Sequence, residues 1–418
     1  MPEIMINQAR LLERFLRYVR IDTTANPSSS SYPSSQGQLV LGRMLLGELQ
    51  GMGLKAEQDG HGLVLATIPG NTLEPAPVIA FNAHLDTSPE TSGTNVSPQV
   101  IPNYAGGDLV LPKDRSKVIR VADNPDLAQL IGKTIITTDG TTLLGADDKA
   151  GIAVMMELAA TLVENPGIPH GDVRLLFTCD EEIGHGVDYV NFEKLASEVA
   201  YTLDGGGENE IDVETFSADL AKITFRGVNI HPSIAKGKMV NAIRTAGEFL
   251  SRLPRATLAP EVTSERQGFL HPYHIEGGVA EAKLQVLLRD FDSGRLEHQA
   301  SLLKTIAHQV ELDYPGLSIE VLIQQQYRNL GDGLAKEPRA VRLAELAHRG
   351  LGRVPRLTII RGGTDGSQLT AKGLPTPNLS TGEHNPHSPL EWTCLEEMVA
   401  AVEVCIELSR LWGLERAN

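Results

Sequence analysis

Acidic and histidine residues follow one short apolar segment after another, and this pattern restricts the fold more than any other feature of the sequence. Predicted strands at 78–82, 134–138, 172–178 and 201–203 alternate with helical patterns such as 152–162. This alternation indicates an α/β domain with a mixed, largely parallel sheet flanked by helices. Because open α/β sheets build their sites at the carboxyl ends of strands, we expect the polar side chains there to meet.

Length, charge and cysteine content exclude several classes of protein. The chain has 418 residues, 41% of them hydrophobic, which is enough for two or three domains with a substantial core. A net charge of −16 argues against nucleic acid or an anionic membrane as the partner. No apolar run reaches the roughly 18 residues that cross a membrane. The N-terminus indicates an amphipathic helix rather than a signal peptide, and three widely spaced cysteines fit a reducing compartment, so we expect a cytoplasmic protein.

The pattern of predicted elements changes after about Thr215 and changes back near Leu330. Between these points the predicted elements are a strand at 220–225, a helix at 239–253, strands at 268–275 and 280–290, a helix at 295–309 and a strand at 317–326. The order β-α-β-β-α-β is the split βαβ arrangement of a ferredoxin-like sandwich. We therefore predict an α/β domain made of 1–214 and 328–418, into which a ferredoxin-like α+β domain of residues 215–327 is inserted.

Seven polar residues stand at the ends of the predicted strands: His84, Asp86, Asp147, Glu181, Glu182, Asp204 and His387. Two imidazoles and several carboxylates suit borderline divalent metals, and zinc first among them. Two metals about 3.5–4 Å apart can share a bridging carboxylate, and the inventory fits two metals better than one. We predict two ligand sets that share one aspartate: His84, Asp147 and Asp204 for one ion, and Asp147, Glu182 and His387 for the other.

Two carboxylates remain outside these ligand sets. Glu181 is predicted to act as a general base that takes a proton from water and passes it to the leaving group. Asp86 lies two residues after His84 on the same strand face, where it is placed to accept the other imidazole N–H and orient the ring. Adjacent glutamates such as Glu181 and Glu182 are most often solvated surface groups, and a lone histidine is most often structural. The other strand-end residues favour the metal site over these readings.

Five short motifs surround the predicted ligands: HLDT at His84, GADDKAG at Asp147, CDEEIG at Glu181, LDGG at Asp204 and NPHSPLEW around His387. In these motifs the sequence resembles the co-catalytic zinc peptidases and deacylases, a family that includes glutamate carboxypeptidase and acetylornithine deacetylase. The resemblance is greatest to its peptidase T branch, the tripeptide aminopeptidases. That branch is also similar to the chain at residues 229–242, at RDFD (289–292) and at RGGTDG (361–366).

The resemblance implies a zinc-dependent aminopeptidase that releases the N-terminal residue from short peptides, tripeptides above all. It implies two Zn²⁺ per chain on the ligand sets given above and Glu181 as the general base. It also implies a cis peptide bond between Asp147 and Asp148. Asp148 itself is expected to be structural.

The same resemblance implies a role for the inserted domain. Residues 215–327 would form a lid, through which the chain could also form a homodimer. His231 matches a lid histidine that polarises the scissile carbonyl as an oxyanion donor. Asn241, Arg289 and Arg361 match positions that contact the substrate, where an arginine fork suits a peptide carboxylate.

Two departures from the family pattern bear on the substrate. Leu390 stands where related sequences carry a second histidine, and the serine-rich segment 28–35, expected as part of a flexible loop, differs from its counterparts. Two alternatives therefore stay open. One is a related zinc amidohydrolase, such as an acyl-amino-acid deacylase or a carboxypeptidase-like enzyme. The other is a metal-binding protein without catalytic activity.

Overall fold

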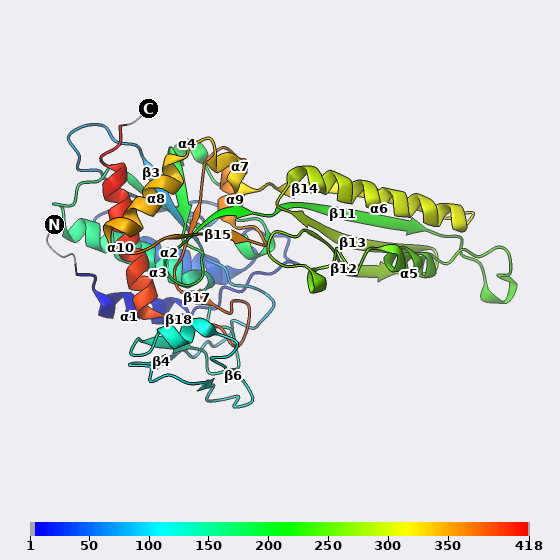
Figure 1. Cartoon of the computed structure of the whole chain (residues 1–418), viewed down its shortest axis with the longest axis horizontal. Helices are drawn as coiled ribbons and strands as arrows, with labels where there is room; N and C mark the ends of the chain where they lie inside the picture. The colour runs from blue at the N-terminus through cyan, green and yellow to red at the C-terminus, as the bar shows by residue number, and fades with distance from the viewer. Residues whose placement is uncertain (1–4, 417–418) are drawn as a thin grey trace. The chain divides into compact units, whose positions relative to one another are not determined.

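The computed structural model describes residues 5–416, which form two compact units (Figure 1). Unit 1 contains the described residues of Met1–Val213, Gly333–Thr358 and Thr364–Asn418. Unit 2 contains Glu214–Asp332 and Ile359–Gly363, so it is built from two separate pieces of sequence. Within the described part of the chain, every helix is too short or too polar to span a membrane.

A mixed sheet forms the centre of unit 1. In residues 5–416 it has eight strands in the order β1-β2-β8-β3-β9-β16-β10-β15. Their bounds are Lys55–Gln58 (β1), Val64–Ile68 (β2), Ile79–His84 (β3), Val173–Thr178 (β8), Val199–Thr202 (β9), Glu210–Thr215 (β10), Arg356–Ile360 (β15) and Asn378–Leu379 (β16). Strands β8, β3, β9 and β16 run parallel, whereas β1, β2 and β10 pair antiparallel. The predicted α/β fold with a mixed sheet is confirmed.

Helices flank this sheet (Figure 1), and nearly all residues of α3 are buried. The helices of unit 1 are α1 (Gln8–Tyr18), α2 (Gln36–Gly51), α3 (Ala146–Glu164), α4 (Phe192–Leu195), α8 (Arg339–Gly350), α9 (Asp365–Ala371) and α10 (Leu395–Trp412), and the short helix α7 (Leu330–Leu334) spans the boundary between the two units in sequence. Helix α3 packs against β3, α1 and α10, which explains why it is apolar on nearly all sides. One buried ion pair, Arg14 Nη1 to Glu157 Oε2 at 2.9 Å, links α1 to α3.

A second sheet of unit 1 brings distant segments together. It has the order β17-β18-β7-β4, with β4 at Gln99–Ile101, β7 at Ile135–Thr137, β17 at Glu383–His384 and β18 at Trp392–Cys394. The strand predicted at 134–138 thus belongs here rather than to the central sheet, because its partner β18 comes from the far end of the sequence. Strands β5 (Leu109–Val110) and β6 (Val118–Ile119) pair antiparallel in a separate two-stranded sheet.

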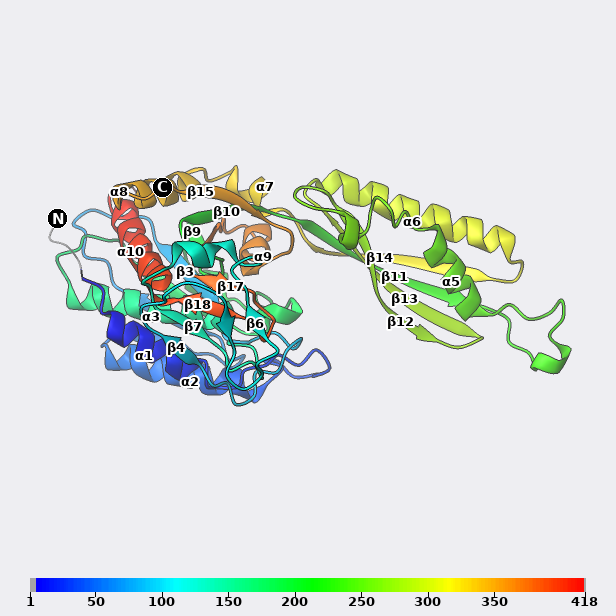
Figure 2. The ribbon, with the colours of Figure 1, turned by 60° about the horizontal axis from the view of Figure 1, so that its bottom comes forward.

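Unit 2 is an α+β sandwich. Its elements are β11 (Ser217–Arg226), α5 (Ala242–Arg252), β12 (Phe269–Gly277), β13 (Glu281–Asp290), α6 (Ser293–Asp313) and β14 (Ser318–Tyr327). The antiparallel sheet has the order β12-β13-β11-β14. Helices α5 and α6 pack against each other and against this sheet (Figure 2), around buried side chains such as Phe225, Phe249 and Leu303. The predicted ferredoxin-like sandwich is confirmed.

Short 3₁₀ helices complete the two units. They are η1 (Pro125–Gln129), η2 (Glu181–Ile183), η3 (Pro232–Ile234) and η4 (Pro260–Val262). Of these, η2 follows directly on the carboxyl end of β8 and carries the two adjacent glutamates. The site is therefore built where the central parallel strands end.

Candidate metal centre

The central strands explain why distant polar residues meet. Strands β8, β3 and β9 are parallel neighbours, so their carboxyl ends lie at the same edge of the sheet. His84 is the last residue of β3, Glu182 lies in η2 after β8, and Asp204 follows β9. Asp147 enters the same edge from the start of α3. His387 comes from the segment between β17 and β18.

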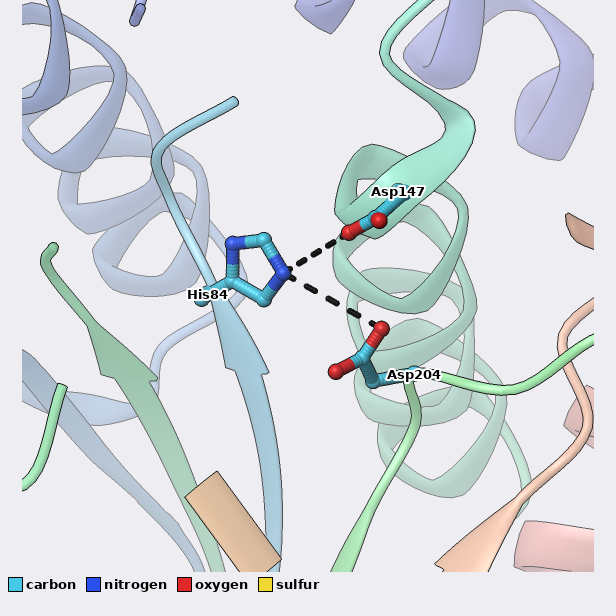
Figure 3. Close-up of side chains that lie close together, drawn as sticks. All are labelled: His84, Asp147 and Asp204. Atoms are coloured by element: carbon cyan, nitrogen blue, oxygen red, sulfur yellow. Dashed lines mark hydrogen bonds and ion pairs between the residues drawn. The ribbon is translucent and has the colours of Figure 1, made fainter. Parts of the chain in front are cut away.

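The first predicted ligand set converges on the ring of His84. Figure 3 shows this ring reaching from β3 toward Asp147 and Asp204. His84 Nε2 lies 2.9 Å from Asp147 Oδ1 and 4.0 Å from Asp204 Oδ1. Its Nδ1–H donates to the main-chain carbonyl of Asp86 at 3.1 Å. This bond fixes the ring so that Nε2 carries the lone pair that a metal ligand needs.

The second predicted set converges on His387. Its Nε2 lies 3.2 Å from Asp147 Oδ2 and 3.0 Å from Glu182 Oε2. Asp147 therefore directs one carboxylate oxygen toward each imidazole. In each set the three possible ligand atoms lie within 4.8 Å of one another. This is the arrangement that a carboxylate shared by two metal ions requires.

The main chain around Asp147 is irregular although it opens a helix. Asp147 has φ −77° and ψ 101°, and its peptide bond to Asp148 is cis, as the family resemblance implies. The Asp148 carboxylate accepts the N–H of His84 at 2.9 Å and the N–H of Gly151 at 3.2 Å. Asp148 thus ties the end of β3 to the start of α3, which agrees with its predicted structural role.

Asp86 differs in detail from the prediction. Its carboxylate lies 3.5 Å from His84 Nδ1, but the carbonyl of the same residue accepts the ring N–H. The carboxylate instead accepts the N–H groups of Glu181 at 3.1 Å and Glu182 at 3.0 Å. Asp86 therefore holds the turn of the two glutamates. Within the described residues, the Glu181 carboxylate makes no hydrogen bond of its own, whereas its main-chain N–H is held by Asp86.

A second carboxylate, which sequence reasoning missed, holds the other side of this turn. Asp180 is buried, with φ +62°, and its oxygens accept the N–H of Ser34 at 2.6 Å, the hydroxyl of Ser34 at 2.5 Å and the Nε2–H of Gln38 at 2.6 Å. The Asp180 N–H donates back to Gln38 Oε1 at 3.0 Å. The segment expected as a flexible loop is thus anchored, because Ser34 packs against the strand end that precedes Glu181.

Charge in the site is strongly unbalanced. Burial raises the pKa of Asp204, and the charge of Asp147 raises it further. Burial and then Asp147 raise the pKa of Glu182 to about 7. Burial lowers the pKa of His387, but its bonds to Asp147 and Glu182 outweigh this and raise it to about 11. Throughout residues 5–416, neither lysine nor arginine forms a salt bridge with Asp147, Glu182 or Asp204.

The donor set fits divalent metal ions. Two imidazoles and three carboxylates are the ligands that zinc accepts, and the carboxylates need a cation to offset their mutual repulsion. One oxygen, Glu182 Oε1, is buried and has no hydrogen-bond partner among the described residues. A buried unpaired carboxylate oxygen is costly, and coordination of a metal would satisfy it.

The four other predicted site residues lie in unit 2. His231 and Asn241 begin η3 and α5, where Asn241 Oδ1 accepts the N–H groups of the first turn. Arg289 Nη1 donates to the carbonyl of Leu288 at 2.9 Å. Arg361 Nη1 donates to carbonyls of the 265–267 turn. Each of these side chains is therefore anchored in unit 2, and none of the four belongs to the groups of possible metal ligands found among the described residues.

Two further carboxylates near the site were missed, although both stand inside motifs quoted above. Asp365, in RGGTDG, is buried at the start of α9 and accepts the hydroxyl of Thr178 at 2.5 Å. Glu391, in NPHSPLEW, is buried and accepts main-chain N–H groups of the segment that leads to Asp147. The motifs were a signal for both residues, but a linear sequence does not tell which segment a carboxylate faces.

Comparison with known proteins gives a family. The model of peptidase family M20/M25/M40 matches residues 144–410, and that of peptidase family M28 matches residues 64–190. A peptidase T from Geobacillus thermodenitrificans is 46% identical over 403 residues, which cover 96% of this chain and 98% of the relative. These matches cover both the metal-ligand segments and the inserted unit.

Solved structures agree with this assignment. A tripeptidase from Staphylococcus aureus superposes with a TM-score of 0.76 at 25% identity, covering 98% of this chain and all of that one. A Bacillus subtilis protein described as a dinuclear metal-binding peptidase of family M20 has the same fold, with a TM-score of 0.64 at 16% identity over 97% of this chain and 98% of that one. With more than half of its length matched by the family model and a curated relative at 46% identity, this chain belongs to peptidase family M20/M25/M40.

Proposed function

We propose that this chain is a metal-dependent aminopeptidase that releases the N-terminal residue from short peptides, with tripeptides as the main substrates. The observation that carries the proposal is the position of Asp147 between the two imidazoles, 2.9 Å from His84 and 3.2 Å from His387. The substrate class is supported by relatives named peptidase T and by the likeness to a tripeptidase. The deacylase and carboxypeptidase alternatives have no comparable support.

In this proposal the ligand residues bind the metal ions and Glu181 transfers protons. Two Zn²⁺ ions bound there would polarise the scissile carbonyl and lower the pKa of a water molecule. His84, Asp147 and Asp204 would hold one ion, and Asp147, Glu182 and His387 the other. Glu181 takes the proton of the attacking water and delivers it to the leaving amine. Asp86 keeps Glu181 in place through its bonds to the main chain of η2.

Unit 2 supplies the substrate contacts in this proposal, as the lid of a catalytic domain made of residues 1–214 and 328–418. His231 Nδ1 accepts the N–H of Ser233 at 3.3 Å, which leaves Nε2–H as the donor to the oxyanion. The amide N–H₂ of Asn241 is left for a substrate, because its oxygen caps α5. Arg289 and Arg361 are proposed to recognise the peptide carboxylate.

We also propose a cytoplasmic location and a homodimer formed through unit 2. The first rests on the three cysteines, which are all free and buried, as is usual in a reducing compartment. The second rests on the family resemblance alone. Size-exclusion chromatography with light scattering would test it, and a monomer at all concentrations would contradict it.

Replacement of the general base tests the mechanism. Glu181→Ala should retain two metal ions per chain and lose turnover by a factor of about 10² or more. The matched control is Glu193→Ala. Glu193 is an exposed glutamate of α4, the helix that follows β8 and η2 in the chain, and this variant should keep full activity. Unchanged turnover in Glu181→Ala would refute the proton-transfer role.

A substrate panel tests the specificity. A tripeptide with a free α-amino group should be cleaved, whereas the same tripeptide with an acetylated N-terminus and an acyl amino acid should not. Rapid cleavage of the blocked compounds would favour the deacylase alternative. Absence of hydrolysis across the panel, in protein that carries metal, would favour the non-catalytic alternative.

A further inference from the structure

The orientation of Asp147 is not explained by the helix that it opens. Its ψ of 101° is non-helical, and Gly145, two residues earlier, has φ +81°. Such a segment has no repeating hydrogen-bond pattern to fix it, and the first N–H groups of a helix have no partner within the helix. The two oxygens of Asp147 nevertheless point at two different imidazoles. Some other group must therefore hold this main chain.

The buried carboxylate of Glu391 is that group. Its Oε2 accepts the N–H of Leu144 at 2.7 Å and the N–H of Gly145 at 2.8 Å, and its Oε1 accepts the N–H of Asp147 at 3.2 Å. The residue is only 1% exposed. Because the three N–H groups donate to both terminal atoms of the side chain, both atoms must be hydrogen-bond acceptors. A carboxylate meets this requirement and a carboxamide does not. A negative charge at the N-terminus of α3 is also favourable.

Glu391 also belongs to the segment that carries His387, the second imidazole of the site. It lies four residues after His387 and directly before β18, which pairs with β7. Its N–H donates to the carbonyl of Ser388 at 3.1 Å, closing a turn between the two residues. One side chain thus connects the segment of His387 to the segment of Asp147, the two ligands that lie 3.2 Å apart.

We infer that Glu391 is a positioning residue that sets the direction of the Asp147 carboxylate and thereby the metal affinity of the site. The inference rests on the proposed metal centre and adds a residue that binds no metal itself. A merely structural glutamate would support the fold without altering how the ligands bind an ion. The two roles therefore differ in metal affinity and in the coordination geometry of the bound ion.

The test is Glu391→Gln, which keeps the volume of the side chain but presents an N–H₂ group to one set of main-chain donors. Co²⁺ is titrated into metal-free protein, and its Kd should rise at least about tenfold, as for other groups that orient metal ligands. The visible absorption spectrum of bound Co²⁺ should change as well. In the metal-free protein, hydrogen exchange of the amides at 144, 145 and 147 should become faster.

The matched control is Glu396→Gln. Glu396 Oε2 likewise accepts a main-chain N–H, that of Thr134 at 2.8 Å, but Glu396 contacts neither ligand segment. This variant should bind Co²⁺ with the affinity and spectrum of the wild type. Glu391→Asp keeps the charge on a shorter side chain, and it should weaken Co²⁺ binding as well. If circular dichroism shows that Glu391→Gln does not fold, the Co²⁺ affinity and spectrum of Glu391→Asp are judged by the same criteria.

The outcomes separate the inference from the proposed function. Wild-type protein that binds no divalent ion would refute the metal centre itself. Wild-type protein that binds two ions, with the same Kd and spectrum in Glu391→Gln, would overturn the role of Glu391 alone. Weaker binding and a changed spectrum in the Glu391 variants, with the Glu396 variant unchanged, would establish it.

Discussion

Replacement of Asp180 by asparagine tests how the turn of the two glutamates is held. The Asp180 side chain is 1% exposed and accepts three hydrogen bonds, from the N–H and hydroxyl of Ser34 and from Gln38. Asparagine has the same shape but only one acceptor oxygen. If that oxygen keeps the two bonds at the Oδ1 position, the N–H₂ group faces the N–H of Ser34. Two buried donors then oppose each other.

The expected cost follows from these contacts. A hydrogen bond to a charged group contributes about 1.5–3 kcal/mol, and a buried donor left without a partner costs about 1–3 kcal/mol. Removing a buried charge offsets part of this, so we expect a net loss of about 2 kcal/mol. Because the entropy of unfolding grows with chain length and Asp180 lies in the larger unit, that loss lowers the melting temperature by roughly 3 °C. Because Glu181 is the next residue, kcat should also fall about tenfold or more.

The assay is calorimetry of metal-free protein together with tripeptide hydrolysis by the metal-loaded protein. Asp188→Asn is the matched control, since Asp188 lies on the same segment but forms an exposed pair with His185 at 2.7 Å, and exposed pairs contribute about 0–1 kcal/mol. Combining Asp180→Asn with Ser34→Ala should give a coupling energy of about 1 kcal/mol or more. Additive effects, or a melting temperature equal to that of the wild type, would refute the reasoning.

Three further predictions concern charge and metal. Glu157→Ala should destabilise the protein by about 3 kcal/mol, because it removes the carboxylate that pairs with both Arg10 and the 8% exposed Arg14 and leaves Arg14 only Glu48, at 3.3 Å; an unchanged melting temperature would contradict this. Burial and then Arg353 lower the pKa of His348 from 6.5 to about 4. The unfolded chain therefore binds this proton at a higher pH than the folded one, and stability falls by roughly 1.4 kcal/mol per unit as the pH drops from 6.5 toward 4. Between pH 7 and pH 5, the free energy of unfolding of His348→Leu should therefore fall by about 2 kcal/mol less than that of the wild type. An identical pH dependence of stability in the two proteins would exclude this role. Removal of metal by a chelator should abolish hydrolysis and lower the melting temperature, with recovery on adding Zn²⁺ or Co²⁺; hydrolysis by protein without detectable metal would contradict the mechanism.

The convergence of three of the predicted ligands could be predicted because it depends on the positions of strand ends. His84, Glu182 and Asp204 each follow an apolar strand, and parallel neighbours end at one edge of the sheet. The sandwich of unit 2 could be predicted for a similar reason, since strands such as β11 and β13 alternate between buried and more exposed residues. These features need no knowledge of which distant segments meet.

The remaining features depend on contacts between distant segments. Ser34 is ordered by Asp180, 146 residues away, so its serine-rich surroundings resembled a loop in sequence. Strand β7 joins the second sheet because β18 pairs with it from the far end of the chain.

The two-piece composition of unit 2 limits how this protein can be engineered. A transplant of 214–332 alone would omit 359–363, which belongs to the same unit. That short piece carries Arg361, whose guanidinium lies 5.1 Å from the ring centre of Phe216 and 5.7 Å from that of Phe269. A chimaera must therefore exchange both pieces together, or the recipient will keep an arginine whose aromatic neighbours have been replaced.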